Sequence, residues 1–219
     1  MRMITLDQAE LLKPAFFDRD PRKVARALLG KVLVRKTRRG LLAGRIVETE
    51  AYLGTGDAAA HTAAGKTARN AVLFGPPSCA YVYFVYGNHY CLNVSCLPDG
   101  VPGGVLFRAL EPMVGIEEMA RARGIEIRSE HDLTVGDLTD KDLRKISSGP
   151  GRMAEAFGIT RKRDNEKSLV SARSDLRIVD DGYRVRRVIA TPRIGITKAA
   201  EQPLRFLIAG NAFVSGRRV

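Results

Sequence analysis

Residues 31–53, KVLVRKTRRGLLAGRIVETEAYL, contain two apolar runs on either side of the basic tetrapeptide TRRG (37–40). The runs are rich in Val, Leu and Ile, which favour extended strands, and Gly40 suits a tight connection. The pattern therefore predicts a β-hairpin with a basic tip, and it makes a β-sheet the starting point of the fold.

Two acidic residues, Glu48 and Glu50, share the second run with Tyr52 at every second position. Because side chains alternate between the two faces of a strand, we expect these three residues and Ile46 on one face, with the acids about 6.5 to 7 Å apart. Both acids can then reach one pocket without touching each other. The alternative is an ordinary half-exposed strand with solvated acids, and this segment by itself favours that alternative.

Further segments predict helices packed on a larger sheet. Asp20 is a candidate N-cap for a helix that begins at Pro21 and ends near Gly30. Strand candidates are AYVYFVY (80–86), HYCLNVSCL (89–97), GGVLFRAL (103–110), YRVRRVIATPRIGIT (183–197) and LRFLIAG (204–210); helix candidates are VGIEEMARARG (114–124) and SSGPGRMAEAFGI (147–159). Strands and helices do not alternate regularly, so the sequence predicts the α+β class with a mostly antiparallel sheet.

The composition of the 219 residues is that of a globular protein, with 45% hydrophobic and 27% charged residues, and one domain is the simplest arrangement. The 36 Lys and Arg exceed the 24 Asp and Glu, which leaves a net charge of +12. Such a positive field attracts polyanions, so nucleic acid is the leading partner class. A membrane partner is disfavoured, because the sequence has no long basic amphipathic helix and no apolar run of spanning length.

The three cysteines, Cys79, Cys91 and Cys96, have no His or second Cys pair at the spacing that a zinc site needs. We therefore predict reduced thiols and no metal. The N-terminal residues MRMITLDQAELLKP lack the apolar segment of a signal peptide. This favours a location in a reducing cytoplasm, at the nucleoid if the protein is bacterial.

Four of the six tyrosines, Tyr81, Tyr83, Tyr86 and Tyr90, fall within YVYFVYGNHY (81–90). Aromatic residues favour strands, so one interpretation is a hairpin whose rings pack in the core. The other starts from Tyr86, which precedes the turn Gly87-Asn88, where the fold itself does not bury large rings. Aromatic side chains stack on nucleobases, and a ring at a loop tip can enter an opened base step. With the positive charge, this indicates a nucleic-acid surface.

Several motifs in chain order resemble the alkyladenine (3-methylpurine) DNA glycosylase family: GRIVETEAYLG (44–54), AAHTAAGKTARN (59–70), YVYFVYGNHYCLNVS (81–95), GVLFRALEP (104–112), SSGPGRMAEAFGI (147–159) and PLRFLIAG (203–210). The similarity extends from about Phe16 to Val214. It implies one glycosylase domain over residues 1–219, with a curved, mostly antiparallel sheet, packed helices and a protruding β-hairpin. It also implies a monomeric enzyme that flips alkylated, deaminated or etheno purines out of duplex DNA, hydrolyses the N-glycosidic bond and leaves an abasic site, without metal or organic cofactor.

The resemblance also implies roles for individual residues. Glu50 is similar to the general base that activates the attacking water, and Arg108 to its partner. The resemblance places Tyr52 and Tyr83 against the faces of the flipped base and His61 at its edge. The residue that excludes the exocyclic amine of guanine is expected at Asn93.

Contacts with DNA outside the base pocket are implied at a second group of positions. Tyr86 matches the residue that enters the duplex. Arg69, Asn70 and the turn that contains Ser148 and Gly149 match segments that contact the DNA backbone. The alternative for this turn is a plain helix start. Glu48 has no assigned role, and we expect it to pair with an arginine.

Two other functions agree with part of the sequence. A non-catalytic nucleic-acid-binding protein would explain the positive charge but not Glu50. A hydrolase of free nucleosides would explain the carboxylate but not the charge. No lysine is placed as a Schiff-base nucleophile, so a glycosylase of this sequence is expected to be monofunctional and to leave the DNA strand intact.

Overall fold

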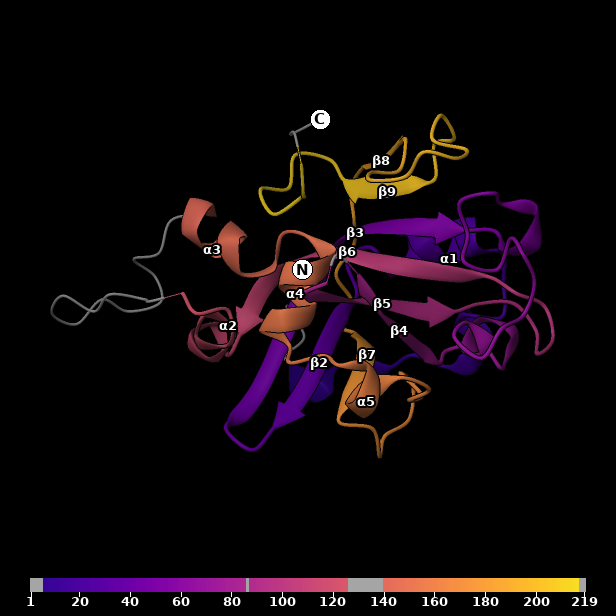
Figure 1. Cartoon of the computed structure of the whole chain (residues 1–219). Helices are drawn as coiled ribbons and strands as arrows, with labels where there is room; N and C mark the ends of the chain where they lie inside the picture. Colours follow the sequence, from indigo (N-terminus) through magenta and orange to yellow (C-terminus); the bar gives the residue numbers. More distant parts are fainter. Residues whose placement is uncertain (1–5, 86, 126–139, 217–219) are drawn as a thin grey trace, which may run out of the picture.

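The computed structural model describes residues 6–85, 87–125 and 140–216 (Figure 1). In this part of the chain, nine strands belong to one sheet, and every pairing between them is antiparallel. Helices pack against the sheet, so the predicted α+β class with a mostly antiparallel sheet is confirmed.

The central strand is β3 (Gly40–Tyr52), which carries both acidic residues. Its first half pairs with β2 (Val32–Thr37), which confirms the predicted hairpin. Its second half pairs with β9 (Arg205–Ile208), and β6 (Gly104–Val114) pairs along the opposite edge. In Figure 1, β9 lies above β3 and β2 below it. The acidic part of β3 is therefore enclosed by a strand on each side.

The order of strands along the sheet is β1 (Glu10–Leu11), β7 (Leu176–Asp180), β2, β3, β6, β5 (His89–Ser95) and β4 (Ala80–Val85), and β8 (Val188–Thr191) pairs with β9. β4 and β5 pair over their whole length and carry the tyrosine cluster. Tyr86, in the connection between them, lies outside the described residues. Whether this hairpin protrudes from the body of the protein stays a prediction.

The helices are α1 (Pro21–Leu28), α2 (Ile116–Ala122), α3 (Asp140–Ser147), α4 (Pro150–Ala156) and α5 (Arg161–Asp164). The predicted N-cap of α1 is confirmed, because the side chain of Asp20 accepts a hydrogen bond from the backbone N–H of Arg22 at 2.8 Å. Among the helices that the structure describes, none has the length and hydrophobicity that crossing a membrane requires.

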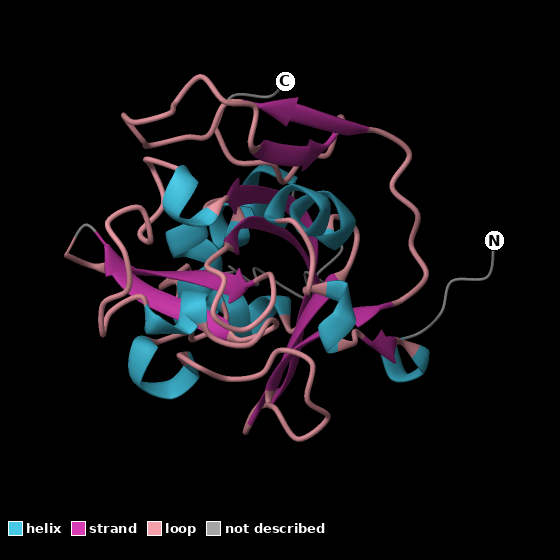
Figure 2. Ribbon diagram, turned by 90° about the vertical axis from the view of Figure 1, so that its right-hand side faces the viewer, coloured by secondary structure: helices cyan, strands magenta, loops and turns pink. Residues whose placement is uncertain are grey.

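The sheet is curved (Figure 2), and its largest hydrophobic cluster joins the inner faces of the strands to α1 and α4. From α1, Val24, Ala25 and Leu28 are buried in this cluster. The hydroxyl of Thr49 in β3 donates a hydrogen bond to the carbonyl of Ala25 at 3.0 Å. Since Thr49 alternates with Glu48 and Glu50, α1 covers the face of β3 that the acids do not use.

The long strand predicted over residues 183–197 is wrong in its extent. Only Val188–Thr191 is a strand, as β8. Pro192 follows directly and has no N–H for a sheet, so the chain leaves β8 there and forms a loop. This loop, residues 192–199, returns toward β3 and becomes part of the site described below.

A buried ionic cluster ties β2 to the C-terminal half of the chain. Nη1 of Arg35 lies 2.8 Å from Oδ1 of Asp164 and 3.1 Å from Oδ2 of Asp175, and Nζ of Lys167 lies 2.5 Å from Oδ1 of Asp175. Burial alone would raise the pKa of Asp175, but the hydrogen bond from Lys167 and the charge of Arg35 lower it to about 2. The pKa of Asp164 is lowered in the same way, against burial, by hydrogen bonding to Arg35.

These lowered pKa values predict a protein whose stability falls in acid. A carboxyl whose folded-state pKa lies below its unfolded value near 4 stabilises the fold above that value, and the contribution is lost as the pH falls through the folded pKa. We expect the free energy of unfolding in urea to decrease between about pH 5 and pH 2. The variant Asp164→Asn should cost about 3 kcal/mol at pH 7, because it removes one partner of a buried ion pair, and should show a shallower pH dependence. An unchanged pH dependence in this variant would contradict the assignment.

Candidate active site

The acidic face of β3 is shaped by an irregular pairing with β6. The register shifts on either side of Glu48 and skips Val47 in β3 and Arg108 in β6. Such β-bulges change the direction of side chains. Ile46 lies before the shift and belongs to the hydrophobic core with Val47 and Ala51. The polar face therefore begins at Glu48 and not, as predicted, at Ile46.

Glu50 is completely buried, with 0% exposure, and both carboxylate oxygens have donors. Oε2 accepts a hydrogen bond from the hydroxyl of Tyr52 at 3.0 Å; Oε1 accepts one from the backbone N–H of Ile194 at 2.9 Å and lies 3.0 Å from Nη1 of Arg108. Burial, and next the charge of Glu50, raise the pKa of Tyr52, so the phenol keeps the proton that it donates. The alternative of a half-exposed strand with solvated acids is wrong.

Glu48 holds the same arginine from the other side. Its Oε1 accepts hydrogen bonds from Nε of Arg108 at 2.8 Å and Nε of Arg205 at 2.6 Å, and its Oε2 accepts one from the backbone N–H of Ser215 at 2.6 Å. Burial opposes the charge of Arg108, but the carboxylates of Glu50 and Glu48 raise the pKa of the guanidinium. The expected pairing of Glu48 with an arginine is confirmed, and it fixes the guanidinium that contacts Glu50.

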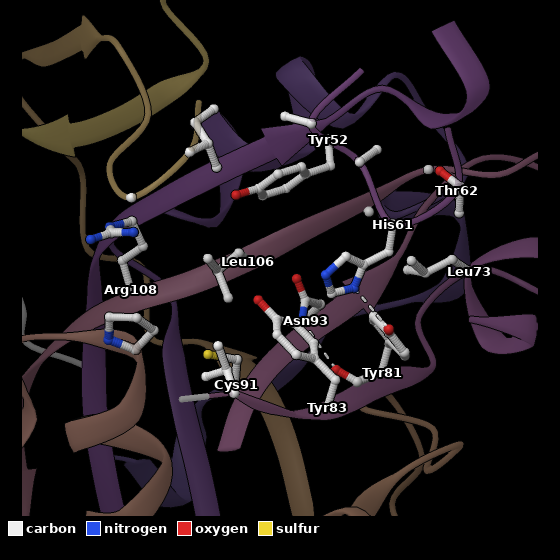
Figure 3. A pocket seen from close by; sticks show the side chains of 18 of the residues that line it. Tyr52, His61, Thr62, Leu73, Tyr81, Tyr83, Cys91, Asn93, Leu106 and Arg108 are labelled. Atoms are coloured by element: carbon white, nitrogen blue, oxygen red, sulfur yellow. Dashed lines mark hydrogen bonds between the residues drawn. The ribbon is translucent and has the colours of Figure 1, made fainter. Parts of the chain in front are cut away.

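A cavity of about 200 Å³ opens beside this network (Figure 3). The residues of its wall that the sequence had indicated are Tyr52, His61, Tyr83, Asn93 and Arg108. Glu50 is not part of the wall. It lies directly behind Tyr52, Arg108 and Ile194, which all line the cavity and all contact its carboxylate.

Aromatic rings enclose the cavity on several sides. Figure 3 shows the rings of Tyr52, from β3, and Tyr83, from β4, on opposite sides, with His61 at one edge. The imidazole of His61 meets the ring of Tyr83 edge-on, with 4.4 Å between ring centroids. A flat, apolar-walled space of this kind suits one planar heterocycle.

The outer face of Tyr52 is covered by a buried arginine. The guanidinium carbon of Arg193 lies 4.7 Å from the centroid of the ring, and its Nη1 and Nη2 lie 2.5 and 2.8 Å from the carboxylate oxygens of Asp57. Both side chains are 0% exposed. Burial would raise the pKa of Asp57, but the hydrogen bonds from Arg193 lower it. The pair anchors the loop that supplies Ile194 to Glu50.

Comparison with known proteins gives this site its context. A family model described as methylpurine-DNA glycosylase matches residues 15–212. The chain belongs to the methylpurine-DNA glycosylase family. It is therefore a DNA glycosylase, a hydrolase of N-glycosyl bonds, and DNA is its substrate.

Curated relatives match nearly the whole chain. Three of them carry the name "Putative 3-methyladenine DNA glycosylase". The protein from Koribacter versatilis is 63% identical over 98% of this chain and 97% of its own length. The protein from Burkholderia lata is 46% identical over 94% of this chain and 91% of its own length. The protein from the archaeon Methanocella arvoryzae is 45% identical over 87% of this chain and 86% of its own length.

Asn93 of the glycosylase lies in the cavity wall on β5. It is nearly buried, and its Nδ2 donates a hydrogen bond to the carbonyl of Tyr81 at 3.3 Å. This bond restricts the orientation of the amide beside the cavity. Its predicted role in excluding guanine stays a prediction.

The segment 61–70 places two of the predicted DNA contacts differently. Asn70 is buried; its Nδ2 donates to the carbonyl of His61 at 2.8 Å and its Oδ1 accepts from the backbone N–H of Thr67 at 2.7 Å. The side chain thus holds the loop that carries His61. Arg69 is exposed, and its guanidinium carbon lies 5.9 Å from the centroid of Tyr83. Contact with the DNA backbone stays a prediction for both residues.

The turn before α4 touches the site through the backbone. The N–H of Gly149 donates to the carbonyl of Arg108 at 3.0 Å, and its φ of 132° lies in the region that favours glycine. Ser148 is buried, and its hydroxyl has no hydrogen-bond partner in the part of the chain that the structure describes. These two positions and Tyr86 stay predictions as DNA contacts, and Tyr86 lies outside the described residues.

Four residues of the site were not singled out from the sequence: Tyr81, Asp57, Arg193 and Arg205. Tyr81 belongs to the tyrosine cluster, which was a usable signal. The other three come from loops or a C-terminal strand, and no local pattern connects them to β3. Among the described residues, no group of three or more His, Cys, Asp or Glu is arranged to hold a metal ion. The three cysteines are free.

Proposed function

We propose that the glycosylase accepts one flipped, damaged purine in the cavity between Tyr52 and Tyr83 and hydrolyses its bond to deoxyribose. The observation that supports this most directly is the placement of Glu50 and Arg108 against the wall of an aromatic cavity. A carboxylate that receives hydrogen bonds only at its edges is suited to act as a general base in that position.

The attacking water would reach Glu50 from the cavity. The carboxylate has no exposed surface, and the groups between it and the cavity are Tyr52, Arg108 and Ile194. A water that enters between these groups could lose its proton to Glu50 while Arg108 orients it. The negative charge of Glu50 would also stabilise an oxocarbenium-like sugar, and Arg108 would limit that charge to what Glu48 leaves uncompensated.

Alkylated purines are the substrate class that this chemistry favours. Alkylation gives the base a positive charge, so the base leaves without a general acid. Hypoxanthine and other deaminated purines are neutral and need help on the leaving side. Burial, and next the charge of Arg69, lower the pKa of His61, so this histidine is a poor proton donor at neutral pH. We therefore expect slower release of deaminated purines, and we propose etheno purines only as further candidates.

The pH dependence of base release tests this order of substrates. With enzyme in excess, release of a cationic methylpurine should be independent of pH above about pH 6, because the leaving base needs no proton. Release of hypoxanthine should rise toward acid, since only a small protonated fraction of His61 can assist it at neutral pH. The same pH profile for both lesions would count against this order.

Binding to duplex DNA should depend steeply on salt. With a net charge of +12 and about six phosphate contacts, a doubling of salt from 100 to 200 mM should weaken binding about 40-fold. The measurement is fluorescence anisotropy with a labelled duplex that contains one lesion. A flat response would favour a hydrolase of free nucleosides, which has no use for the charge.

The direct test of the function is a duplex with a single methylpurine. We expect a released free base and strand breaks that form only after heating in alkali, as for a monofunctional glycosylase that leaves an abasic site. Breaks without alkali would contradict hydrolysis without strand cleavage. Binding without base release would revive the non-catalytic alternative, which Glu50 and its neighbours disfavour. A monomer and a location at the chromosomal DNA are consistent with this proposal and stay predictions.

A further inference from the structure

Tyr81 contacts the predicted base-reading residue from behind. Its hydroxyl lies 2.9 Å from Nδ1 of His61, and the two rings are perpendicular, with centroids 5.9 Å apart. The side chain of Tyr81 is 1% exposed and sits in a small cluster with Val72 and Leu73. Its hydroxyl is therefore held at a fixed point on the wall.

The environment of the hydroxyl decides which group donates. Burial raises the pKa of Tyr81, and it outweighs the opposing charge and hydrogen bond of Arg69. The phenol thus keeps its proton, while its oxygen faces the cationic donor Arg69. The O–H is left to point at Nδ1 of His61, which then accepts.

The same arginine acts on the histidine. Burial and the charge of Arg69 lower the pKa of His61, so the imidazole is neutral at physiological pH. A neutral imidazole has one donor and one acceptor nitrogen. When Nδ1 accepts from Tyr81, the proton must be on Nε2. Figure 3 shows this second ring nitrogen directed away from Tyr81, into the space between Tyr52 and Tyr83.

We propose that Tyr81 is a positioning residue that fixes His61 as an Nε2–H donor, and that the cavity therefore prefers purines with a hydrogen-bond acceptor on the edge that faces His61. A keto oxygen or an unprotonated ring nitrogen satisfies this donor. An amino group at the same place puts donor against donor and leaves a polar group unpaired. This inference rests on the proposed function, because it assumes that the flipped base occupies the cavity.

The preference should depend on the charge of the base. A neutral purine with a keto group, such as hypoxanthine, gains from the donor both in binding and as its departing ring becomes more electron-rich. A methylated, cationic purine leaves readily without it. The hydroxyl of Tyr81 should therefore matter more for the neutral substrate.

The test combines a spectroscopic and a kinetic measurement on Tyr81→Phe. In long-range proton–nitrogen spectra of protein labelled with ¹⁵N-histidine, wild-type His61 should show the Nε2–H tautomer, with the signal assigned by its loss in His61→Gln. In Tyr81→Phe the signal should move toward a mixture of tautomers. Under single-turnover conditions, hypoxanthine release should fall about tenfold, and 7-methylguanine release by less than about threefold.

Tyr90→Phe is the matched control. It removes a phenol oxygen from β5, the neighbouring strand, where the ring of Tyr90 packs on Phe84 rather than on the cavity wall. It should change neither the spectrum nor the rates, and equal melting temperatures would show that both variants fold. An Nδ1–H tautomer in the wild type, or an unchanged tautomer in Tyr81→Phe, would overturn the inference. Absence of base release from wild type on both lesions would overturn the proposed function instead, and the spectra would still report on Tyr81.

Discussion

Glu50→Gln will reduce the release of a methylpurine from duplex DNA by about a thousandfold, the upper part of the range for loss of a general base. The amide keeps the shape of the side chain and can still accept hydrogen bonds from Tyr52 and from the N–H of Ile194. It cannot take a proton from water, and it offers no negative charge to the sugar. Binding to the damaged duplex should stay within about threefold of wild type, because Glu50 is behind the cavity wall.

The control for this variant is two residues away. Glu48 is equally buried and contacts the same guanidinium, but its other partners are Arg205 and Ser215 rather than cavity residues. Glu48→Gln should mainly lower the free energy of unfolding, by about 3 kcal/mol, because it leaves buried arginines without a charged partner. The two variants are compared in urea unfolding and in single-turnover base release at a temperature where both are folded. A greater loss of base release in Glu48→Gln than in Glu50→Gln would reverse the two roles.

The fold could be predicted where local patterns are strong. The alternation in residues 31–53 and the turn at TRRG predicted β2 and β3, and Asp20 with Pro21 predicted the start of α1. In contrast, β1 has only the two residues Glu10–Leu11, and β7 lies in a segment where Ser, Arg and Asp interrupt the apolar pattern. These strands exist because they pair with each other and with β2, and long-range pairing leaves little trace in the local sequence.

The site shows the same division. Alternation placed Glu48 and Glu50 on one face, but not their burial, because the groups that cover them come from the other end of the chain. Arg205 reaches Glu48 from β9, and Ile194 reaches Glu50 from the loop after β8. The bulge that presents Arg108 is also a property of two paired strands, and one strand alone does not specify it.

The loop after β8 gives the second large effect, through its anchor. Asp57→Asn will reduce base release about a hundredfold, because a catalytic group that shifts by about 1 Å loses activity on this scale. The variant weakens the hold on Arg193, whose guanidinium supports the outer face of Tyr52 and donates to the carbonyl of Ala51 at 3.1 Å. The neighbouring N–H of Ile194, which orients Glu50, shifts with it. Because both partners are buried, the free energy of unfolding should also fall, by about 3 kcal/mol.

The chain contains a matched ion pair that separates these two effects. Arg45 and Asp181 form bonds of 3.0 and 2.8 Å, Nη1 of Arg45 also donates to the carbonyl of Gly30 at 2.8 Å, and the guanidinium carbon lies 4.2 Å from the ring of Tyr183. This pair repeats the chemistry of Asp57 and Arg193, but none of its residues lines the cavity. Asp181→Asn should lower stability and leave base release within about threefold, because it does not move a catalytic group. Equal rates in the two variants, at a temperature where circular dichroism shows both folded, would mean that the loop holds Glu50 without its anchor.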